Sequence, residues 1–350
     1  MTNWLFILGI ALLIVPLYLW SFKSLPKERW QIIAAVPIRK SADGTWQGLN
    51  LTFYGLFNAI ALSSGVGLTI VLTGAAGVNC ILFITLLSTL LAICLPASRI
   101  IARWVEKKPN TFSIGAASFT GIVLGPWVAQ GVNLVAERLL QIPPFDTMAV
   151  LSSMVIAYTL GEGLGRLACI SFGCCYGNPI DQAPRWVRRY FSWATFTYSG
   201  CTKKIAYAHH LDGKKVMAIP AITAVIYTFG ALSGTILFLY GHYSGAFFFC
   251  LLVTQGWRFI SEFLRSDYRG NRNISVYQIM SLITIPYALV ILILFPSGGN
   301  ELNILDGLHI LWNPAVLLFL QTLGIIMFLR TGKSQTTGSG LSFHVNHDRI

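Results

Sequence analysis

Charged side chains are scarce in this sequence. Only 11% of its 350 residues are Asp, Glu, Lys or Arg, whereas a soluble domain usually has about 25%. Hydrophobic residues make up 55% of the chain, and the mean hydropathy is +0.65. The composition argues against a soluble enzyme and predicts a protein that crosses a membrane several times.

Acidic residues are the scarcer sign of charge, with 13 Asp and Glu against 25 Lys and Arg and a net charge of +12. In a soluble protein this excess would suggest a nucleic-acid partner. Here the basic residues fall between apolar runs. We therefore expect them to face anionic lipid headgroups and expect no nucleic-acid partner.

A regular cysteine pattern is also missing. The seven cysteines are scattered, and Cys80, Cys94 and Cys250 fall inside apolar runs. Buried thiols at such positions act as small hydrophobic side chains. The spacing therefore predicts no disulfide framework.

Long apolar runs dominate what is present. A run of about 18 or more apolar residues can cross a bilayer as a helix. We predict an all-α polytopic membrane protein, a bundle of about eight to nine transmembrane helices with a small surface head. The candidate spans lie at roughly 4–20, 51–73, 78–98, 114–136, 147–171, 216–240, 244–264, 275–296 and 308–329.

Three regions follow from these runs. Residues 1–44 form an extra N-terminal span and an interfacial segment at 30–38. Residues 45–330 form the membrane domain, and its basic, aromatic connection at about 173–215 is the expected head. Residues 331–350 are polar and rich in Gly and Ser, so we expect a disordered tail.

The basic residues also predict how the chain is inserted. Lys23, Lys27 and Arg29 follow the first span in place of a small-residue cleavage site, so we interpret it as a retained span. Connections after the odd-numbered spans hold nearly all the basic residues. By the positive-inside rule these connections face the cytoplasm, which places the N-terminus outside.

Two spans carry ionisable residues, each of which costs about 2.5–3.5 kcal/mol on insertion scales. Glu162 and Arg166 are four residues apart in one span, and Arg258, Glu262 and Arg265 share one helical face in another. One interpretation is that these residues only neutralise each other along each helix. The other is a phosphate site, because the planar guanidinium fork suits phosphate oxygens.

The phosphate interpretation gains support from the surplus of arginines beyond the second of these spans. Arg265, Arg269 and Arg272 together outnumber the local acids. A cationic pocket near the headgroup layer is expected to attract a phospholipid.

Three cysteines lie at the end of the fifth predicted span, in the segment GRLACISFGCCYG. Cys169, Cys174 and Cys175 leave three interpretations open. Small residues packing at a helix end are favoured, and a nucleophilic or redox thiol activated by nearby arginine comes second. A metal site is the least favoured and is not expected, because zinc ligands usually come as C-x2–4-C with partners elsewhere, and the nearby histidines are His209 and His210.

Several segments in order resemble the prolipoprotein diacylglyceryl transferase family over roughly residues 45–295. FYGL (53–56), SFTGIVLG (118–125) and GRLACISFGCCYG (165–177) resemble its core helices and its signature motif. WRFISEFLR (257–265) and YQIMSLITIPY (277–287) resemble two later helices. The ordered set is specific, whereas each piece alone would not be.

The resemblance implies an enzyme that moves a diacylglyceryl group from phosphatidylglycerol to a lipoprotein cysteine thiol, without a metal or organic cofactor. It implies a multi-pass protein of the bacterial plasma membrane whose partners are an anionic phospholipid and a prolipoprotein signal peptide. In the family the head faces away from the cytoplasm, opposite to the charge bias of this chain, and both orientations stay open. The catalytic residues implied are Arg166 and Arg258, and we add Cys174 and Cys175 as candidate catalytic residues of this chain. The candidate substrate-binding residues are Tyr54, Thr120, Gly165, Cys169, Gly173, Tyr176, Gly177, Glu262 and Arg265.

The sequence departs from the family where a thiol would be activated. Thr120 stands at a family histidine, Cys169 and Phe172 stand at signature asparagines, and Cys174 stands at a signature glutamate. We expect a divergent member in which His209 or His210 acts as base, or in which Cys174 carries the lipid transiently. The alternative is a phospholipid-binding membrane protein that has lost the transfer chemistry. A transporter is less favoured, because no pair of broken-helix repeats is recognisable.

Overall fold

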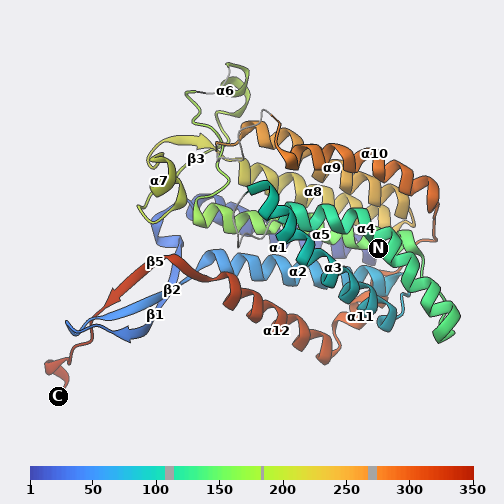
Figure 1. Cartoon of the computed structure of the whole chain (residues 1–350), viewed down its shortest axis with the longest axis horizontal. Helices are drawn as coiled ribbons and strands as arrows, with labels where there is room; N and C mark the ends of the chain where they lie inside the picture. The colour runs from blue at the N-terminus through green and yellow to red at the C-terminus, as the bar shows by residue number, and fades with distance from the viewer. Residues whose placement is uncertain (107–113, 183–184, 267–273) are drawn as a thin grey trace.

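The computed structural model describes residues 1–106, 114–182, 185–266 and 274–350. Among these residues, nine helices are long and apolar enough to cross a membrane. The expected polytopic all-α membrane fold is confirmed (Figure 1). These helices are α1 (Thr2–Ser24), α2 (Phe53–Ala75), α3 (Cys80–Glu106), α4 (Ile114–Val135), α5 (Thr147–Phe172), α8 (Ile219–Leu239), α9 (Tyr243–Leu264), α10 (Val276–Leu294) and α12 (Pro314–Thr331).

Helix α5 is the centre of the bundle. It packs against α2, α8 and α9, and 72% of its most apolar window is buried. A Cβ added to Gly161 would lie 3.2 Å from the carbonyl oxygen of Ala61 on α2. Small residues allow such close backbone approach between membrane helices. Helix α5 therefore carries its charged residues inside protein rather than against lipid.

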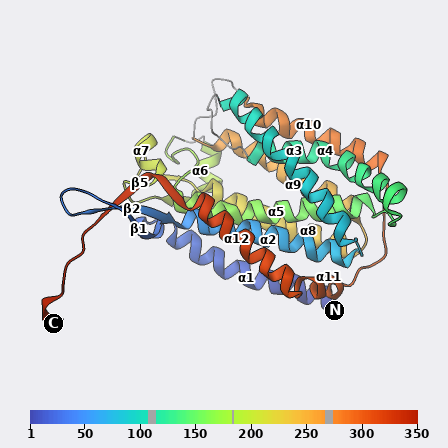
Figure 2. The same ribbon diagram turned by 60° about the horizontal axis from the view of Figure 1, so that its bottom comes forward.

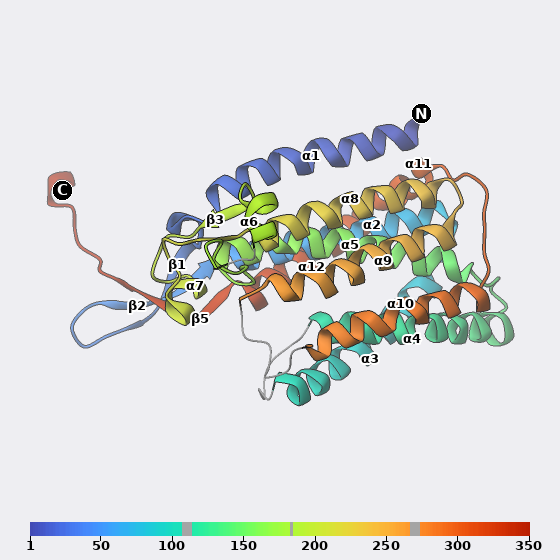
Figure 3. The same ribbon diagram turned by 90° about the horizontal axis from the view of Figure 1, so that it is seen from above.

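The outer helices turn apolar side chains outward. Only 22% of the apolar windows of α1 and α3 are buried, and none of the α12 window is. Helices α3, α4 and α10 form a layer that meets the rest of the bundle mainly through α9 (Figure 3). Helix α12 lies along α2 on another face (Figure 2). These exposed apolar faces suit contact with lipid.

The last span begins later than the sequence predicted. A short helix, α11 (Ile304–Leu311), precedes α12, and Asn313 caps α12 by accepting from the backbone N–H of Ala315 at 2.9 Å. Pro314 then occupies the first helical position, where its missing N–H costs nothing. The Asn-Pro pair therefore separates the two helices. A single turn of π-helix, η2 (Ala136–Leu140), extends α4 at its far end.

A three-stranded sheet lies at one end of the bundle. Strands β1 (Ile32–Lys40), β2 (Trp46–Thr52) and β5 (Lys333–Leu341) pair antiparallel in the order β1-β2-β5. The sheet includes the expected interfacial segment and spans the expected boundary between residues 44 and 45. The tail expected to be disordered instead supplies β5, because sheet pairing uses backbone groups that a Gly- and Ser-rich segment also offers.

The head follows α5 and lies at the same end as the sheet (Figure 1). It contains α6 (Arg185–Phe191), β3 (Thr195–Thr197), α7 (Lys204–His209) and β4 (Lys215–Met217), with β3 and β4 paired antiparallel. A 3-10 turn, η1 (Glu28–Trp30), lies between α1 and the sheet, and a second one, η3 (His347–Arg349), lies near the C-terminus. The N-terminus and α11 lie at the opposite end of the bundle (Figures 1 and 3).

Lys203 joins the head to the bundle. Its side chain is fully buried, and its ammonium donates to the carbonyl oxygen of Leu25 at 3.1 Å and of Ser171 at 2.7 Å. These carbonyls belong to the ends of α1 and α5, where helices leave carbonyls unpaired. Burial lowers the pKa of Lys203 to about 8, and Glu28 only partly offsets this effect.

Candidate functional site

Two arginines from different helices meet at one carboxylate. Arg166 in the last turns of α5 pairs with Glu162 one turn earlier, and Nη1 of Arg258 on α9 lies 4.0 Å from the same Glu162 oxygen. The exposed fraction is 17% for each arginine side chain and 6% for the glutamate. The structure thus brings Arg258 to Glu162, which lies 96 positions earlier in the sequence.

The charges in this group do not balance. Two guanidinium groups face one carboxylate, which leaves a formal charge of +1. Arg166 also has a buried Nε that finds no hydrogen-bond partner among the described residues. A buried donor without a partner costs about 1–3 kcal/mol unless a ligand supplies an acceptor. A monoanion that accepts hydrogen bonds satisfies both needs.

A second ion pair lies farther along α9. Nη1 of Arg265 is 4.0 Å from Oε2 of Glu262, and both side chains are 8% exposed. This pair is neutral, so it leaves the net charge of +1 on the neighbouring group unchanged. Arg269 and Arg272, which the sequence argument also used, lie outside the described residues.

Neighbouring residues position Arg258. Its Nη1 lies 3.4 Å from the hydroxyl of Tyr158 on α5, and a Cβ added to Gly115 on α4 would lie 2.4 Å from its Nη2. A larger residue at position 115 would therefore displace the guanidinium. Sequence reasoning missed this role of Gly115.

The end of α5 turns sharply and brings three thiols together. Gly173 ends the helix in the left-handed region at φ 71°, and the N–H of Cys174 donates back to the carbonyl of Cys169 at 3.0 Å. Cys175 is also left-handed, at φ 59°, which is unusual for a residue with a side chain. The Sγ atoms of Cys169, Cys174 and Cys175 all lie within 4.8 Å of one another.

The adjacent cysteines have different acidities. The pKa of Cys175 lies well below its usual range, because hydrogen bonding with the thiols of Cys169 and Cys174 would stabilise its thiolate and the arginines Arg265 and Arg166 attract a negative charge. The same neighbours, together with burial, hold the pKa of Cys174 well above its usual range. The sequence argument left both Cys174 and Cys175 open as the reactive thiol, and these directions favour Cys175 as the thiolate.

The next turn ties this motif to α9 and the head. Gly177 forms an isolated bridge with Arg265, and a Cβ at Gly177 would lie 2.6 Å from the Cβ of Met217. Tyr176 is buried, and its hydroxyl pairs with Nδ1 of His209. Gly177 and Tyr176 thus connect the cysteine turn to its surroundings. His210 is exposed and ends α7.

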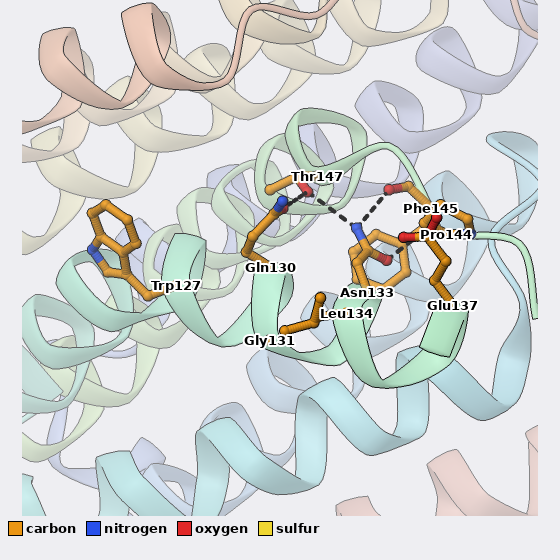
Figure 4. A pocket seen from close by; sticks show the side chains of 9 residues that line it. All are labelled: Trp127, Gln130, Gly131, Asn133, Leu134, Glu137, Pro144, Phe145 and Thr147. Atoms are coloured by element: carbon orange, nitrogen blue, oxygen red, sulfur yellow. Dashed lines mark hydrogen bonds between the residues drawn. The ribbon is translucent and has the colours of Figure 1, made fainter. Parts of the chain in front are cut away.

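A cavity of about 500 Å³ lies at the other end of α5 (Figure 4). The hydroxyl of Thr147 donates to Gln130, and the amide of Asn133 donates to the Phe145 carbonyl at 2.9 Å, so the polar lining is largely paired with itself. None of the predicted site residues lines the cavity, and Thr147 precedes Arg166 by 19 residues, about 28 Å along a helix. Its lining consists of Trp127, Gln130, Gly131, Asn133, Leu134, Glu137, Pro144, Phe145 and Thr147.

The family described as prolipoprotein diacylglyceryl transferase matches residues 45–294. The chain belongs to the prolipoprotein diacylglyceryl transferase family. The match begins after α1 and β1 and ends with α10.

A curated relative agrees with this family. The phosphatidylglycerol–prolipoprotein diacylglyceryl transferase of Clostridium tetani (strain Massachusetts / E88) is 32% identical over 146 residues. The match covers 40% of this chain and 51% of the relative, so the chain spans about half the length of that protein. No solved structure matches the chain.

Thr120 on α4 is another of the predicted substrate-binding positions. Thr120, which stands at the expected family histidine, is buried and donates its hydroxyl to the Ala116 carbonyl at 2.9 Å. This bond within α4 occupies its proton, and a hydroxyl is a poor base at neutral pH. Thr120 is therefore not expected to act as a base.

The remaining predicted positions lie around the thiols and α5. The ring of Tyr54, at the start of α2, lies 5.5 Å from the ring of Phe172, and its hydroxyl is within electrostatic range of the three cysteines. Gly165 faces α2, where an added Cβ would make ordinary contact with Ala61 at 3.7 Å. Tyr54 is therefore placed beside the site, whereas Gly165 is a packing position.

Proposed function

We propose that this chain is a diacylglyceryl transferase of the bacterial plasma membrane. In this proposal it takes the diacylglyceryl group of an anionic phospholipid, phosphatidylglycerol, and transfers it to the thiol of a lipoprotein cysteine next to its signal peptide. Family membership and the name of the relative support the reaction class. The apolar helices support a location within a membrane.

The observation that carries the proposal is the net charge of +1 around Glu162. A phosphodiester headgroup linkage carries one negative charge, which balances the two arginines and one glutamate. Its oxygens would accept the free Nε–H of Arg166. Arginine forks bind phosphate in a bidentate manner, and the low exposure of both side chains strengthens the electrostatic attraction.

The same arginines fit the chemistry of transfer. The acceptor sulfur forms a bond to the glyceryl carbon, and the carbon–oxygen bond to the phosphate breaks. The leaving glycerol phosphate gains a negative charge on that oxygen as the bond breaks. Arg166 and Arg258 stabilise the developing charge because they are already oriented when it forms.

Complementation tests the proposal. The chain is expressed in bacteria depleted of their own transferase, and lipoprotein modification is followed by the mass of a reporter lipoprotein. We expect modification to return, and we expect Arg258→Ala to abolish it while the exposed control Arg39→Ala preserves it. Phospholipid co-purified with each variant is identified by mass spectrometry.

The alternative function is an outcome of the same experiment. If the purified chain retains phosphatidylglycerol through Arg258 but no lipoprotein is modified, the chain binds phospholipid without transferring it. If it neither retains anionic phospholipid nor modifies a lipoprotein, both functions are rejected.

A further inference from the structure

The three thiols at the end of α5 converge on a common point, which simple packing does not require. Their Sγ atoms lie within 4.8 Å of one another, and the sulfurs of Cys174 and Cys175 are 3.9 Å apart. Two left-handed residues, Gly173 and Cys175, fold the chain back to produce this arrangement. In an extended or helical chain, adjacent cysteines would point in different directions.

The spacing of the sulfurs matches metal coordination. Zinc binds cysteine sulfur at about 2.3 Å, so three sulfurs around one zinc ion lie roughly 3.8–4.0 Å apart in tetrahedral or trigonal geometry. The observed spacing reaches these values with small rotations of the side chains. Thiolate ligands also select thiophilic ions such as zinc over magnesium or calcium.

The surroundings favour such an ion. Three thiolates and Zn²⁺ carry a net charge of −1, and Arg166 and Arg265 both lie within electrostatic range of Cys175. The cysteines are half-buried, so the ion would be partly shielded from water. Among the described residues, the group that could hold a metal contains these three cysteines and no fourth ligand.

We propose that Cys169, Cys174 and Cys175 bind a zinc ion whose fourth coordination position takes the acceptor thiol. This inference rests on the proposed transferase function. Catalytic zinc sites have three protein ligands and one open position, and a thiol that coordinates zinc is deprotonated. The ion therefore supplies what Thr120 lacks, a means of making the acceptor thiolate near neutral pH.

The step balances without a further co-reactant. The acceptor thiol loses its proton to water when its sulfur binds zinc. The zinc-bound sulfur then attacks the glyceryl carbon, the carbon–oxygen bond breaks, and the bonding pair leaves with the phosphate held by Arg166 and Arg258. The thioether product is a weaker ligand than a thiolate and leaves the ion. No cysteine of the enzyme becomes acylated, alkylated or oxidised.

Metal content tests the site independently of activity. The full-length protein is purified in detergent without chelators, and metals are measured by inductively coupled plasma mass spectrometry. We expect about one zinc per chain, and we expect cobalt substitution to give the charge-transfer absorption of thiolate ligands. Less than one tenth of an equivalent, before and after incubation with zinc, would overturn the proposal.

Serine variants assign the ligands. Cys169→Ser, Cys174→Ser and Cys175→Ser are each expected to lower zinc content at least fivefold, whereas Cys201→Ser in the exposed head is the matched control and retains it. Monodispersity in detergent checks the fold of each variant. Zinc retained by all three variants would overturn the assignment, and the wild-type metal content remains decisive if a variant does not fold.

Transfer assays separate this inference from the proposed function. Lipoprotein modification that is lost on zinc removal and restored by zinc supports a catalytic ion. Full modification by zinc-free protein would overturn the inference and leave the transferase function standing. A lipid adduct on Cys174, or a disulfide among the three cysteines in active protein, would also overturn it. Zinc binding together with failure to modify any lipoprotein would reject the catalytic role and the transferase function, and would leave only a structural metal site.

Discussion

Arg166 and Arg258 share one carboxylate, and this sharing leaves the group with a net positive charge. Either arginine alone with Glu162 would form a neutral pair. Helical spacing predicted such a pair for Glu162 and Arg166. The structure shows that the second guanidinium reaches the same oxygen at 4.0 Å. In the proposed phosphate site, either the positive charge alone or the planar shape of the guanidinium could hold the ligand.

Arg166→Lys addresses that question because it keeps the charge and removes the planar fork. Lysine is a point charge that does not bind phosphate in a bidentate manner. We expect lipoprotein modification to fall by about 100-fold, the usual effect of losing one preorganised donor. The measurement is the modification rate of a reporter lipoprotein, with protein amount held equal. Activity near that of the wild type would show that positive charge suffices.

Gly115→Ala tests the packing of the second arginine. The new Cβ would lie 2.4 Å from Nη2 of Arg258, the far end of a flexible side chain, so the guanidinium would shift and the fold would persist. We expect transfer to fall at least about tenfold, because small misplacements of a catalytic group are costly. Gly131→Ala on the same helix is the control, since no atom lies within 4 Å of its added Cβ. Equal activities of the two variants would reject this role of Gly115.

The elements that hold the site are the C-terminal turn of α5 and the head that covers it. Gly173 ends α5, an added Cβ there would lie 3.1 Å from Lys203, and Lys203 in turn binds carbonyls of α1 and α5. The extra N-terminal helix is thus connected to the signature motif through one buried lysine. Because the pKa of this buried lysine is lowered, we expect the free energy of unfolding of the protein to depend on pH.

Lys203 is expected to make the protein more stable as the pH rises above about 8. Its pKa is lowered from 10.5 to about 8 in the folded chain, so between these values the unfolded chain binds more protons and the free energy of unfolding increases with pH. Below pH 8 the ammonium is charged in both states, and this group adds no slope. The apparent Tm in detergent, measured on both sides of pH 8, should show this rise.

Substitution of Lys203 tests whether this residue causes the pH dependence of Tm. Lys203→Met should remove the rise in Tm, and it should also lower Tm because the carbonyls of Leu25 and Ser171 lose their donor. Lys204→Met, at the partly exposed next position, should leave the profile unchanged. An identical profile in all three proteins would mean that Lys203 does not titrate in this range.

At the scale of the whole molecule, both functional clusters lie toward the end of the bundle that carries the head, in the last turns of α5 and α9 and just beyond α5. The head and the sheet that includes the C-terminal strand share that end, and the N-terminus lies at the other (Figure 1). The positive-inside rule places this end in the cytoplasm, whereas the family resemblance places it outside. Arginines that bind phosphate add to the basic count without serving insertion, which weakens the charge argument.

Labelling of single-cysteine variants is expected to place the head outside the cell. Cys201 in the head and Cys80 at the start of α3 are both exposed and lie at opposite ends of the bundle. An impermeant alkylating reagent on intact cells should modify the variant that retains only Cys201 and spare the one that retains only Cys80. The reverse result would establish the orientation predicted by charge. Labelling of both only after permeabilisation would contradict both orientations.

Much of the fold could be predicted because apolar length alone decides whether a helix can span a bilayer. The long runs gave the bundle, and ordered motifs such as GRLACISFGCCYG and WRFISEFLR indicated the family before any contact was known. The tail was harder to predict. Strand β5 pairs through backbone groups, and its Gly- and Ser-rich sequence carries no period-2 pattern of apolar residues that would mark a strand.

The sequence by itself determined that this is a membrane protein and that arginines lie within its membrane-spanning helices, because hydropathy and charge are properties of the residues alone. Only the tertiary structure decided which charges meet. Helical spacing paired Glu162 with Arg166, but the packing of α9 against α5 added Arg258 and made the group cationic. Likewise, C-x4-C-C spacing did not indicate a metal site, whereas two left-handed residues bring its three sulfurs within 4.8 Å. Backbone turns and helix crossings, which no local pattern specifies, therefore determine the chemistry that this site can perform.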